Sequence, residues 1–519
     1  MVLGLVLVLI LVTSIFIKKF LLKHHDYFPP SPLALPIIGH FHLLCPLIHR
    51  SFHDLSIRFG PIFSLRLGSI PCIVVTSPEL AKEILKSHEL SFVNRLQTTV
   101  VETMTYNASF AFGPYGNIWK YTKKLIANKL LSSRSVDNFG AIRNQEYIRL
   151  LRLLAKKAET SESVNLSEEL PRLSHNVIGQ MMMGNYSSTS RAEEMASVVR
   201  EATQIFGEFN FSDFNWIWKK FDLQGFRKRT EAIHKKFDAL VEKVIAEREE
   251  LRKIQKKGNN ITEEEDVKGF LDILLDIVEN KSIEDLEVEF SRDHVKGLIT
   301  DMFAASIDTT SIAMEWALAE LINHPELLEK ARSEIDRVVE KERLVGESDV
   351  PKLIYIQAII KETIRLHPPL TSVARKCVKQ CKVDKYVIAK DTTLFINTWA
   401  IGRDPKYWEK PLEFYPERFL QLDGGDKATA VDVRGQHFQF LPFGSGRRIC
   451  PGITLSMKML PALLAALIQC FDWKGVGTHC KNNVLEMDEK PGFTTPRAYD
   501  LVCVPVARFS HLSILNHDP

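Results

Sequence analysis

Hydrophobic residues recur with a helical period along most of the chain from Leu47 onward. In the stretch Gly60–Pro78 they instead alternate with polar residues, a pattern that predicts a β-hairpin. The stretch Lys385–Gly402 is also rich in strand-forming residues. The residues 291–324 predict one long helix, unusually apolar near its middle and stopped by Pro325. The pattern therefore predicts a mainly α-helical fold with small β-sheets.

The chain carries no obvious internal division. Its residues are 45% hydrophobic, and no long Gly/Ser-rich or Pro-rich linker or internal repeat interrupts them. Residues 247–268 are largely charged, which predicts a solvated connection between two helices. We therefore expect one large domain over residues 41–519.

The N-terminal segment predicts a membrane anchor. Val2–Ile17 contains no charge, and lysines follow at 18, 19 and 23. A cleaved signal peptide is the competing interpretation, but no basic region precedes the apolar run and no small-residue cleavage site follows it. Lysines on the C-terminal flank favour a cytosolic domain. We expect an anchor over residues 1–22 and a basic, proline-rich hinge over residues 23–40.

Charge and cysteine content exclude some classes of function. The net charge of +3 is too small to indicate nucleic-acid binding. The eight cysteines show no paired spacing typical of zinc sites; Cys377 and Cys381 form an isolated C-x-x-x-C. Unpaired thiols suit a cytosol-facing domain better than a secreted one.

The stretch FLPFGSGRRICPG, residues 440–452, places one cysteine among glycines and arginines. A cysteine thiolate can serve as the proximal ligand of haem iron. Glycines let the backbone approach a flat cofactor and direct N–H groups at the sulfur, and an arginine can pair with a haem propionate. The pattern F-x-x-G-x-R-x-C-x-G is formed by Phe443, Gly446, Arg448, Cys450 and Gly452. Gly444, directly after Phe443, is a further glycine of this stretch.

This stretch resembles the cysteine loop of the cytochrome P450 haem-thiolate monooxygenases, and further matches follow in the family's order along nearly the whole chain. The resemblance implies the cytochrome P450 fold, in which a long central oxygen-binding helix and the cysteine loop enclose haem b. It implies Cys450 as the iron ligand, with Phe443, Gly444, Arg448 and Gly452 around the cofactor. It also implies electrons supplied from NADPH through a reductase.

In the long helix, the sequence AASIDTT resembles the family's oxygen-activation motif. The resemblance implies catalytic roles for Asp308 and Thr309, in proton delivery and oxygen binding. Ser306 departs from the motif, which usually has glycine there. Its hydroxyl can bond back to a carbonyl one turn earlier and bend the helix.

Two further sets of residues match family motifs. Glu362 and Arg365 lie three residues apart before His-Pro-Pro, and FYPERF supplies Arg418. The implied role of these three is a structural ion network. E-x-x-R alone is weak, because it also begins at Glu146, Glu249 and Glu340. The implied propionate-binding residues are Trp119, Lys123 and Arg375, where Lys123 keeps the charge of the family's arginine but loses its fork.

The segments EWALAELINHPELLEKARSEIDRVV, LIQCFDW and PRAYDLVCVPVAR resemble a plant branch that contains flavone synthase II, flavanone 2-hydroxylase and isoflavone synthase. Ile205–Phe226 and LPIIGHFHLL favour the flavone synthase II side. Isoflavone enzymes generally carry a lysine and a serine at positions that match Ala374 and Ala304. We therefore expect oxidation of a flavanone such as naringenin at C2 and C3 to a flavone such as apigenin.

Other outcomes remain open from sequence alone. Within the class, the alternatives are 2-hydroxylation of the flavanone and synthesis of 2-hydroxyisoflavanone by aryl migration; outside it, a non-catalytic haem-binding membrane protein. The substrate-pocket residues implied by family position are Ala304, Ala305, Leu370, Thr371, Thr494 and Thr495.

The expected partners are an NADPH-cytochrome P450 reductase and the endoplasmic reticulum membrane. A positive face of Lys120, Lys123, Lys124, Arg447 and Lys458 would suit an acidic reductase. An aromatic cluster either lines a membrane-side entrance or packs in the core; its members are Phe206, Phe209, Phe211, Phe214, Trp216 and Trp218.

Overall fold

The computed structural model describes residues 27–508, with gaps at 185–188, 216–220, 223, 258–267, 281–289, 340–342 and 421–430. The expected anchor, residues 1–22, therefore lies outside the described residues, as does the first part of the hinge.

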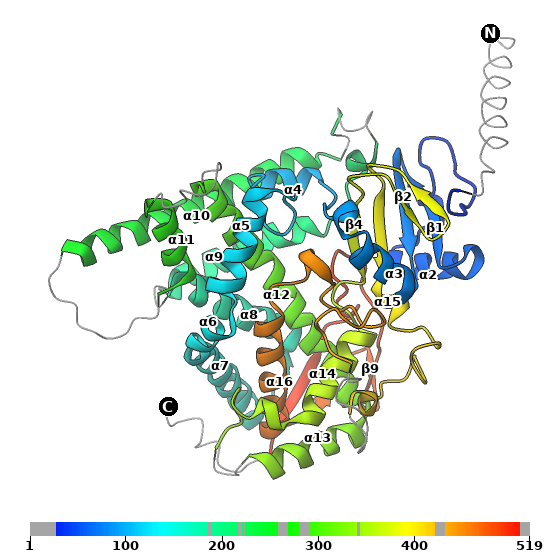
Figure 1. Cartoon of the computed structure of the whole chain (residues 1–519). Coiled ribbons are helices and arrows are strands. Elements are labelled where there is room, and N and C mark those ends of the chain that lie inside the picture. Colours follow the sequence, from blue (N-terminus) through cyan, green and yellow to red (C-terminus); the bar gives the residue numbers. More distant parts are fainter. Residues whose placement is uncertain are drawn as a thin grey trace, which may run out of the picture.

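Helices make up most of this structure, as the hydrophobic period predicts (Figure 1). Their bounds are α2 Ile48–Phe59, α3 Pro78–Lys82, α4 Thr99–Met104, α5 Asn117–Leu125, α6 Ser133–Asn138, α7 Gly140–Glu159, α8 Leu166–Met183, α9 Thr189–Phe206, α10 Phe226–Lys257, α11 Phe270–Asn280, α12 Arg292–Asn323, α13 Pro325–Val338, α14 Ile354–Leu366, α15 Thr398–Ile401 and α16 Ile453–Cys470.

The long helix α12 crosses the middle of the molecule and packs against α8, α14 and α16. Ser291 caps its start, with the backbone N–H of Ser291 donating to His294 Nδ1 at 3.1 Å. It ends one residue before His324, and Pro325 opens α13. The predicted long helix is thus confirmed.

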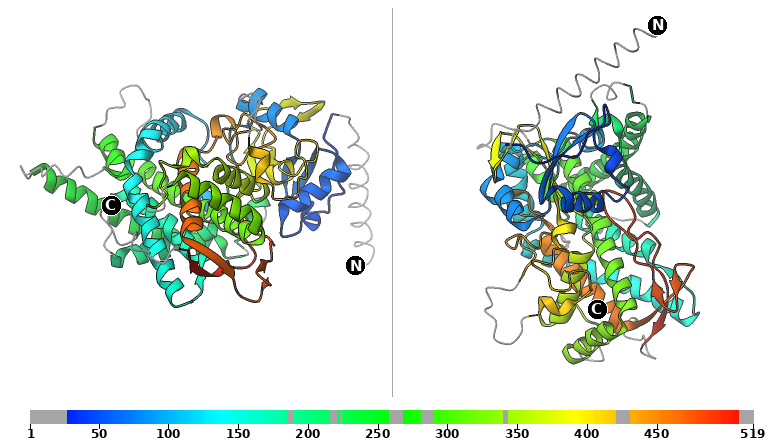
Figure 2. Two further views of the ribbon diagram at one scale, coloured as in Figure 1. Left: turned by 90° about the horizontal axis from the view of Figure 1, so that it is seen from below. Right: turned by 90° about the vertical axis from the view of Figure 1, so that its right-hand side faces the viewer.

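The strands form four small sheets. The largest has the order β1-β2-β7-β4, in which β1 (Ile62–Leu67) and β2 (Ile70–Val75) are the predicted hairpin, β2 runs parallel to β7 (Thr393–Asn397), and β4 (Ser372–Lys376) runs antiparallel to β7. A second sheet joins β3 (Val164–Asn165), β11 (Val502–Ala507) and β8 (Phe471–Gly475). The two remaining pairs are β5 (Cys381–Val383) with β6 (Tyr386–Ile388) and β9 (Cys480–Lys481) with β10 (Val484–Leu485). Figure 2 shows the largest sheet near one end of the molecule and the long helices toward the other.

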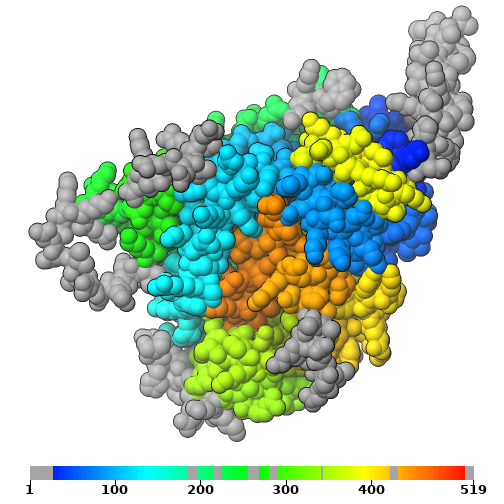
Figure 3. All heavy atoms as spheres, in the orientation of Figure 1, coloured from blue at the N-terminus to red at the C-terminus, as the bar shows by residue number. Residues whose placement is uncertain are grey.

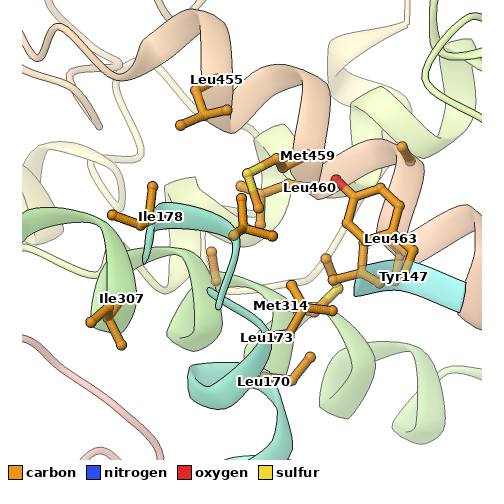
Figure 4. Close-up of a cluster of buried hydrophobic side chains, with 14 of the residues drawn as sticks. Tyr147, Leu170, Leu173, Ile178, Ile307, Met314, Leu455, Met459, Leu460 and Leu463 are labelled. Carbon is orange, nitrogen blue, oxygen red and sulfur yellow. The ribbon is translucent and has the colours of Figure 1, made fainter. Parts of the chain in front are cut away.

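The main core lies where α12, α8, α7 and α16 meet. Ile307 and Met314 of α12 face Ile178 of α8 and Met459 of α16 in this cluster (Figure 4). The same continuous core reaches from Val100 near the N-terminal side to Cys503 in β11. Burial of this continuous apolar surface is the main force that fixes α12 in place.

One expectation about a connection is wrong. Residues 247–257 of the charged stretch belong to α10, which continues to Lys257, and residues 258–267 lie outside the described residues. The charges pair with neighbouring helices: Arg248 binds Asp272 of α11 at 2.6 Å, and Glu249 accepts from Arg292 of α12 at 2.6 Å. The charged residues therefore extend a helix instead of ending it.

Among the described residues, the one helix long and apolar enough to cross a membrane is α16, with a mean hydropathy of 1.6. Because 72% of it is buried inside the molecule, α16 is a core helix.

Candidate functional site

The cysteine loop, residues 440–452, forms a tight turn that ends at the start of α16. Gly444 and Gly446 adopt φ angles of 69° and 70°, which side chains with a Cβ rarely tolerate. A Cβ at Gly446 would also overlap the Glu89 carboxylate. The Cys450 N–H donates to the Phe443 carbonyl at 3.0 Å. These constraints hold the sulfur-bearing residue at a fixed place before the helix.

The environment of the Cys450 thiol combines burial with groups that favour its anion. Burial raises the pKa of Cys450, while the Gly452 N–H and the cations Arg95 and Lys123 act to lower the pKa. A Cβ at Gly452 would lie 3.6 Å from Cys450 Sγ, so the backbone approaches the sulfur closely. A metal cation on the sulfur would stabilise the thiolate outright.

Three arginines converge beside the loop. Arg375 and Arg448 are buried, and burial together with Arg95 lowers the pKa of both. Burial lowers the pKa of Arg95 as well. Among the described residues none of the three forms an ion pair with a carboxylate, and Arg95 Nε is buried without a hydrogen-bond partner. Such a cluster fits a ligand with two carboxylates, as haem has in its propionates.

Arg448 is also bound to the protein. Its guanidinium donates to the carbonyls of Val93 at 2.9 Å and Gly113 at 2.6 Å, and lies 4.3 Å from the Trp119 ring centroid. Trp119 Nε1 donates to the Phe110 carbonyl at 2.9 Å. In this structure Trp119 therefore supports Arg448, and its own contact with the cofactor stays a prediction.

Lys123 also has a protein partner, since its Nζ donates to the Ile449 carbonyl at 3.1 Å inside the cysteine loop. Arg375 lies on β4 and donates only locally, to the Ala374 carbonyl at 2.9 Å. The predicted cofactor contacts of both residues stay predictions. Arg95 was missed, because it lies outside the motifs identified in the sequence; a lone arginine in the stretch SFVNRL was the available signal.

Asp301 of α12 was also missed in the sequence. This residue binds the loop 109–113, which lies beside the arginines. Its buried carboxylate accepts from Ser109 Oγ at 2.6 Å and from the N–H groups of Phe110 and Ala111 at 2.6 and 3.2 Å. Burial raises the pKa of Asp301 to about 6. Since the carbonyls of this loop hold Arg448 and Trp119, Asp301 links α12 to the arginine cluster.

The long helix α12 becomes accessible to solvent in its middle. The residues before and after are buried, whereas Ala305 is exposed and Asp308 and Thr309 are partly exposed. Thr309 Oγ1 donates to the Ala305 carbonyl at 2.7 Å, and burial raises the pKa of Asp308. Ser306 Oγ donates to the Met302 carbonyl, as expected, and α12 continues through this point without interruption.

The remaining predicted pocket residues lie on two segments. Leu370 is 36% exposed, Thr371 and Thr494 are partly exposed, and Thr495 is buried. The two segments are joined directly, because the Thr495 N–H donates to the Pro369 carbonyl at 3.0 Å. Thr495 thus holds its loop in place, and its side chain contributes little accessible surface.

Glu362, Arg365 and Arg418 form one buried network. Arg365 donates to both carboxylate oxygens of Glu362 at 2.7 and 2.8 Å, and Arg418 Nε donates to it at 3.0 Å. Arg365 also donates to the Gly402 and Pro411 carbonyls at 2.5 and 2.8 Å. The network therefore ties α14 to the segment that leads toward the cysteine loop.

The predicted aromatic cluster divides into two. Phe209 packs on Phe211 and Phe214 at centroid distances of 4.9 and 5.0 Å, and Phe209 and Phe211 remain 41% and 46% exposed. Phe206 instead stacks on Phe112 at 6.2 Å. Trp216 and Trp218 lie outside the described residues. The described part is therefore a surface cluster with one inward-packed member.

Figure 3 shows the segment around the cysteine loop (orange) at the molecular surface, beside the segment that includes α5 (blue to cyan). Lys120, Lys124 and Arg447 are exposed there, and Tyr115 lies 5.2 Å from Lys120 Nζ and 5.9 Å from Arg447 Cζ. Lys458 pairs with Asp137. Arg447 Nε also pairs with Glu89 at 3.1 Å, and Lys123 points inward, so the exposed cations Lys120 and Lys124 carry most of the predicted positive face.

The partly buried Cys450 with cations nearby, the three arginines without carboxylate partners among the described residues, and the accessible middle of α12 together fit a haem-thiolate site. The family model of cytochrome P450 matches residues 29–504, and the chain belongs to that family. It is a haem-thiolate monooxygenase of the plant group numbered 93. Its relatives include cytochrome P450 93B2 of Gerbera hybrida, 51% identical with 95% of this chain and 94% of the relative covered.

Cytochrome P450 93B16 of Glycine max is 50% identical, covering 96% of this chain and 95% of the relative. The 2-hydroxyisoflavanone synthase of Glycyrrhiza uralensis is 47% identical, covering 93% and 92%. A zebra fish cytochrome P450 solved with abiraterone shares the fold, with a TM-score of 0.72 at 24% identity over 89% of this chain and all of that chain. The predicted fold class is confirmed.

Proposed function

We propose that this protein converts flavanones such as naringenin to flavones such as apigenin. The overall reaction is flavanone + O2 + NADPH + H⁺ → flavone + 2 H2O + NADP⁺, with the electrons passed through a reductase at the endoplasmic reticulum membrane. One hydrogen leaves C2 of the substrate and one leaves C3, so that a C2=C3 double bond forms.

The observation that carries this proposal is the resemblance of Ile205–Phe226 to flavone synthase II, together with alanine at position 374. The isoflavone enzymes generally have lysine there. In agreement, two relatives numbered 93B are 50 and 51% identical to this chain, above the 47% of the 2-hydroxyisoflavanone synthase of Glycyrrhiza uralensis.

The side chains of the proposed pocket suit a flat, weakly polar substrate. Ala304 and Ala305 on α12 carry only methyl groups, and Leu370 and Ala374 would add apolar surface. Small apolar side chains leave room for a ring system, and Thr371 and Thr494 supply hydroxyls that can orient its polar groups.

Different residues of the chain would bind the haem and deliver the proton. Cys450 would ligate the haem iron, while Arg95, Arg375 and Arg448 would hold the propionates. The bound haem supplies oxygen activation. Burial raises the pKa of Asp308, so that its carboxyl retains a proton at a higher pH than an exposed aspartate, which suits a proton donor beside Thr309.

The test is turnover of naringenin by the full-length protein in microsomes with reductase and NADPH. Apigenin as the product is the expected result, and the reduced protein with carbon monoxide should show the thiolate type of difference band. Cys450→Ser should abolish that band. Release of 2-hydroxyisoflavanone, or no turnover of flavanones by protein with the band, would contradict the proposal.

A second candidate is 2-hydroxyisoflavanone synthesis, favoured by the 47% identity to enzymes of that name. A third is 2-hydroxylation, flavanone + O2 + NADPH + H⁺ → 2-hydroxyflavanone + H2O + NADP⁺. Chromatography of the products without acid treatment separates these outcomes, because acid would dehydrate the hydroxylated products.

A haem-binding protein without oxygen chemistry is the alternative from another class. The variant Thr309→Ala separates this alternative from a monooxygenase. If the protein is a monooxygenase, the amount of product formed per NADPH consumed should fall several-fold in the variant. Thr300→Ala is the matched control, since Thr300 on the same helix makes the same backbone bond but is buried. Equal coupling in both variants would contradict the role of Thr309.

A further inference from the structure

Trp316 lies on α12 about two turns beyond Thr309 and therefore on the same face, about 10 Å further along the axis. Its indole is fully buried. The His367 ring stacks on it with centroids 3.9 Å apart and planes 4° apart, and the Arg497 guanidinium lies 5.3 Å from its centroid. Contacts with His367 and Arg497 thus fix the orientation of the indole.

The indole N–H has one specific partner. Trp316 Nε1 donates to the Thr495 carbonyl at 3.1 Å, and both groups are buried. The N–H of the same Thr495 donates to the Pro369 carbonyl at 3.0 Å. Thr495 is thus held from two directions, by α12 on one side and by the residues after α14 on the other.

The segment 369–371 is itself firmly bound. The Leu370 carbonyl accepts from Thr398 Oγ1 at 3.2 Å, and the Thr371 carbonyl accepts from the Trp399 N–H at 3.2 Å. With the bond from Thr495 to Pro369, three successive carbonyls of this segment have partners. Segment 369–371 can therefore serve as a fixed reference for the loop that carries Thr494.

That loop, residues 488–498, is closed at its base and open at its tip. The Ala498 N–H donates to the Asp488 carbonyl at 2.8 Å, and the Lys490 N–H donates to the Pro496 carbonyl at 2.9 Å. At the tip, Phe493 is 51% exposed. The hydrogen bonds of Thr495 to Trp316 and to Pro369 are therefore the buried hydrogen bonds nearest to Thr494.

We propose that Trp316 is a positioning residue, whose N–H fixes Thr494 and Thr495 against α12 and the segment 369–371 and so sets how the substrate lies. This inference rests on the proposed function, in which the pocket takes a flavanone. Loss of the second hydrogen from C3 competes with hydroxylation at C2. A looser pocket wall should favour hydroxylation, because desaturation requires both carbons to be held in place.

The test compares Trp316→Phe with Trp473→Phe in the full-length, haem-loaded protein. Phenylalanine at 316 keeps a ring that can stack on His367 but removes the N–H. Trp473 is the matched control, since it is 6% exposed on β8 and its Nε1 has no hydrogen-bond partner among the described residues.

The first measurement is hydrogen–deuterium exchange of the peptide that covers residues 488–498, without substrate. Trp316→Phe should exchange there about five- to tenfold faster than wild type, as expected for loss of one buried hydrogen bond. Trp473→Phe should match wild type, and both variants should keep the wild-type carbon monoxide band. Unchanged exchange in Trp316→Phe, or equal acceleration in both variants, would overturn the inference.

The second measurement is the ratio of 2-hydroxyflavanone to flavone and the product formed per NADPH. In Trp316→Phe the ratio should rise at least threefold and coupling should fall, with an increased KM. Faster exchange with an unchanged ratio, coupling and KM would overturn the positioning role. If wild type oxidised no flavanone, the proposed function would fail, whereas the exchange result would still decide whether Trp316 holds the loop.

Discussion

At the scale of single residues, the arginine cluster has an unbalanced charge. Burial lowers the pKa of Arg95, Arg375 and Arg448, and the charge of Arg95 lowers the pKa of the other two further. A bound dianion would reverse the sign of that repulsion. If the cluster holds the propionates as proposed, cofactor binding would come at the expense of the stability of the cofactor-free protein.

Arg95→Ala tests this balance. We expect several-fold weaker retention of haem, measured as haem per protein after dilution, with the thiolate band unshifted in the loaded fraction. The cofactor-free form should unfold at the same or a higher temperature than wild type, because one buried charge is gone. The control is Lys86→Ala, an exposed cation, which should change neither quantity. Wild-type haem retention in Arg95→Ala would contradict the role of Arg95.

Sequence motifs could indicate some of these residues and not others. Cys450, Arg448 and Arg375 stand in stretches with a recognisable spacing, so their positions could be predicted. Arg95 and Asp301 come near Arg448 only in the folded chain, since loop 109–113 bonds to both Asp301 and Arg448, and Arg448 also bonds to the carbonyl of Val93, two residues before Arg95. A contact made by three distant segments leaves no local pattern.

At the scale of elements, Glu362 joins α14 to the segment around Arg418. Glu362 and Arg365 have fully buried side chains, so Glu362→Gln leaves Arg365 and Arg418 without their counter-charge. We expect a loss of about 3–5 kcal/mol in unfolding free energy, measured by denaturant midpoint. Because that variant can fail to accumulate, Arg418→Lys provides a milder case that keeps the charge.

The control for Glu362 is another pair with the same spacing. Glu250 and Lys253 are also three residues apart on a helix but about two-thirds exposed. Glu250→Gln should cost less than about 0.5 kcal/mol. Similar losses in Glu362→Gln and Glu250→Gln would show that burial does not decide the importance of this pair.

Glu315 of α12 should make the free energy of unfolding depend on pH. Burial raises the pKa of Glu315 to about 7, although Ser167 Oγ donates to it at 2.6 Å and Arg497 lies 3.9 Å away. The folded state thus holds a proton that the unfolded state releases near its ordinary pKa of 4.5. Stability from this group is present below that value and is lost as pH rises to about 7.

Glu315→Gln should remove this loss. Between pH 5 and 8 the unfolding midpoint of wild type should fall relative to that of the variant, by an amount corresponding to roughly 2–3 kcal/mol. Glutamine can still accept from Ser167, so the variant should fold. Thermal unfolding across this pH range measures the difference, and parallel curves would contradict the assignment.

The elements themselves could be predicted where the periodicity is strong. The hairpin at residues 60–78 and the helix at residues 291–324 agree with their predictions because local pattern and burial coincide. The charged residues 247–257 do not, since partners on α11 and α12 neutralise them. Ion pairs between helices override the local preference of such a stretch for solvent.

At the scale of the whole molecule, one continuous core begins well after the N-terminal segment. It extends from Val100 to Cys503, and a smaller cluster around Phe52 and Phe63 packs on the largest sheet. Among the described residues 27–40, none belongs to these clusters, although His40 is buried and its Nδ1 accepts from the Arg66 N–H at 2.7 Å. We therefore predict that residues 41–508 fold without the expected anchor, residues 1–22, which lies outside the described residues.

Deletion of residues 1–22 should separate membrane attachment from folding. The truncated protein should retain the thiolate type of carbon monoxide band and the unfolding temperature of the full chain, because its core is intact. Alkaline carbonate should release it from microsomes, whereas the full chain should stay in the pellet. Some attachment should persist at neutral pH, since Tyr27, Phe28, Leu33 and Ile37 are more than half exposed and apolar. Release of both forms by carbonate would contradict the anchor, and loss of the band on truncation would show that the fold requires it.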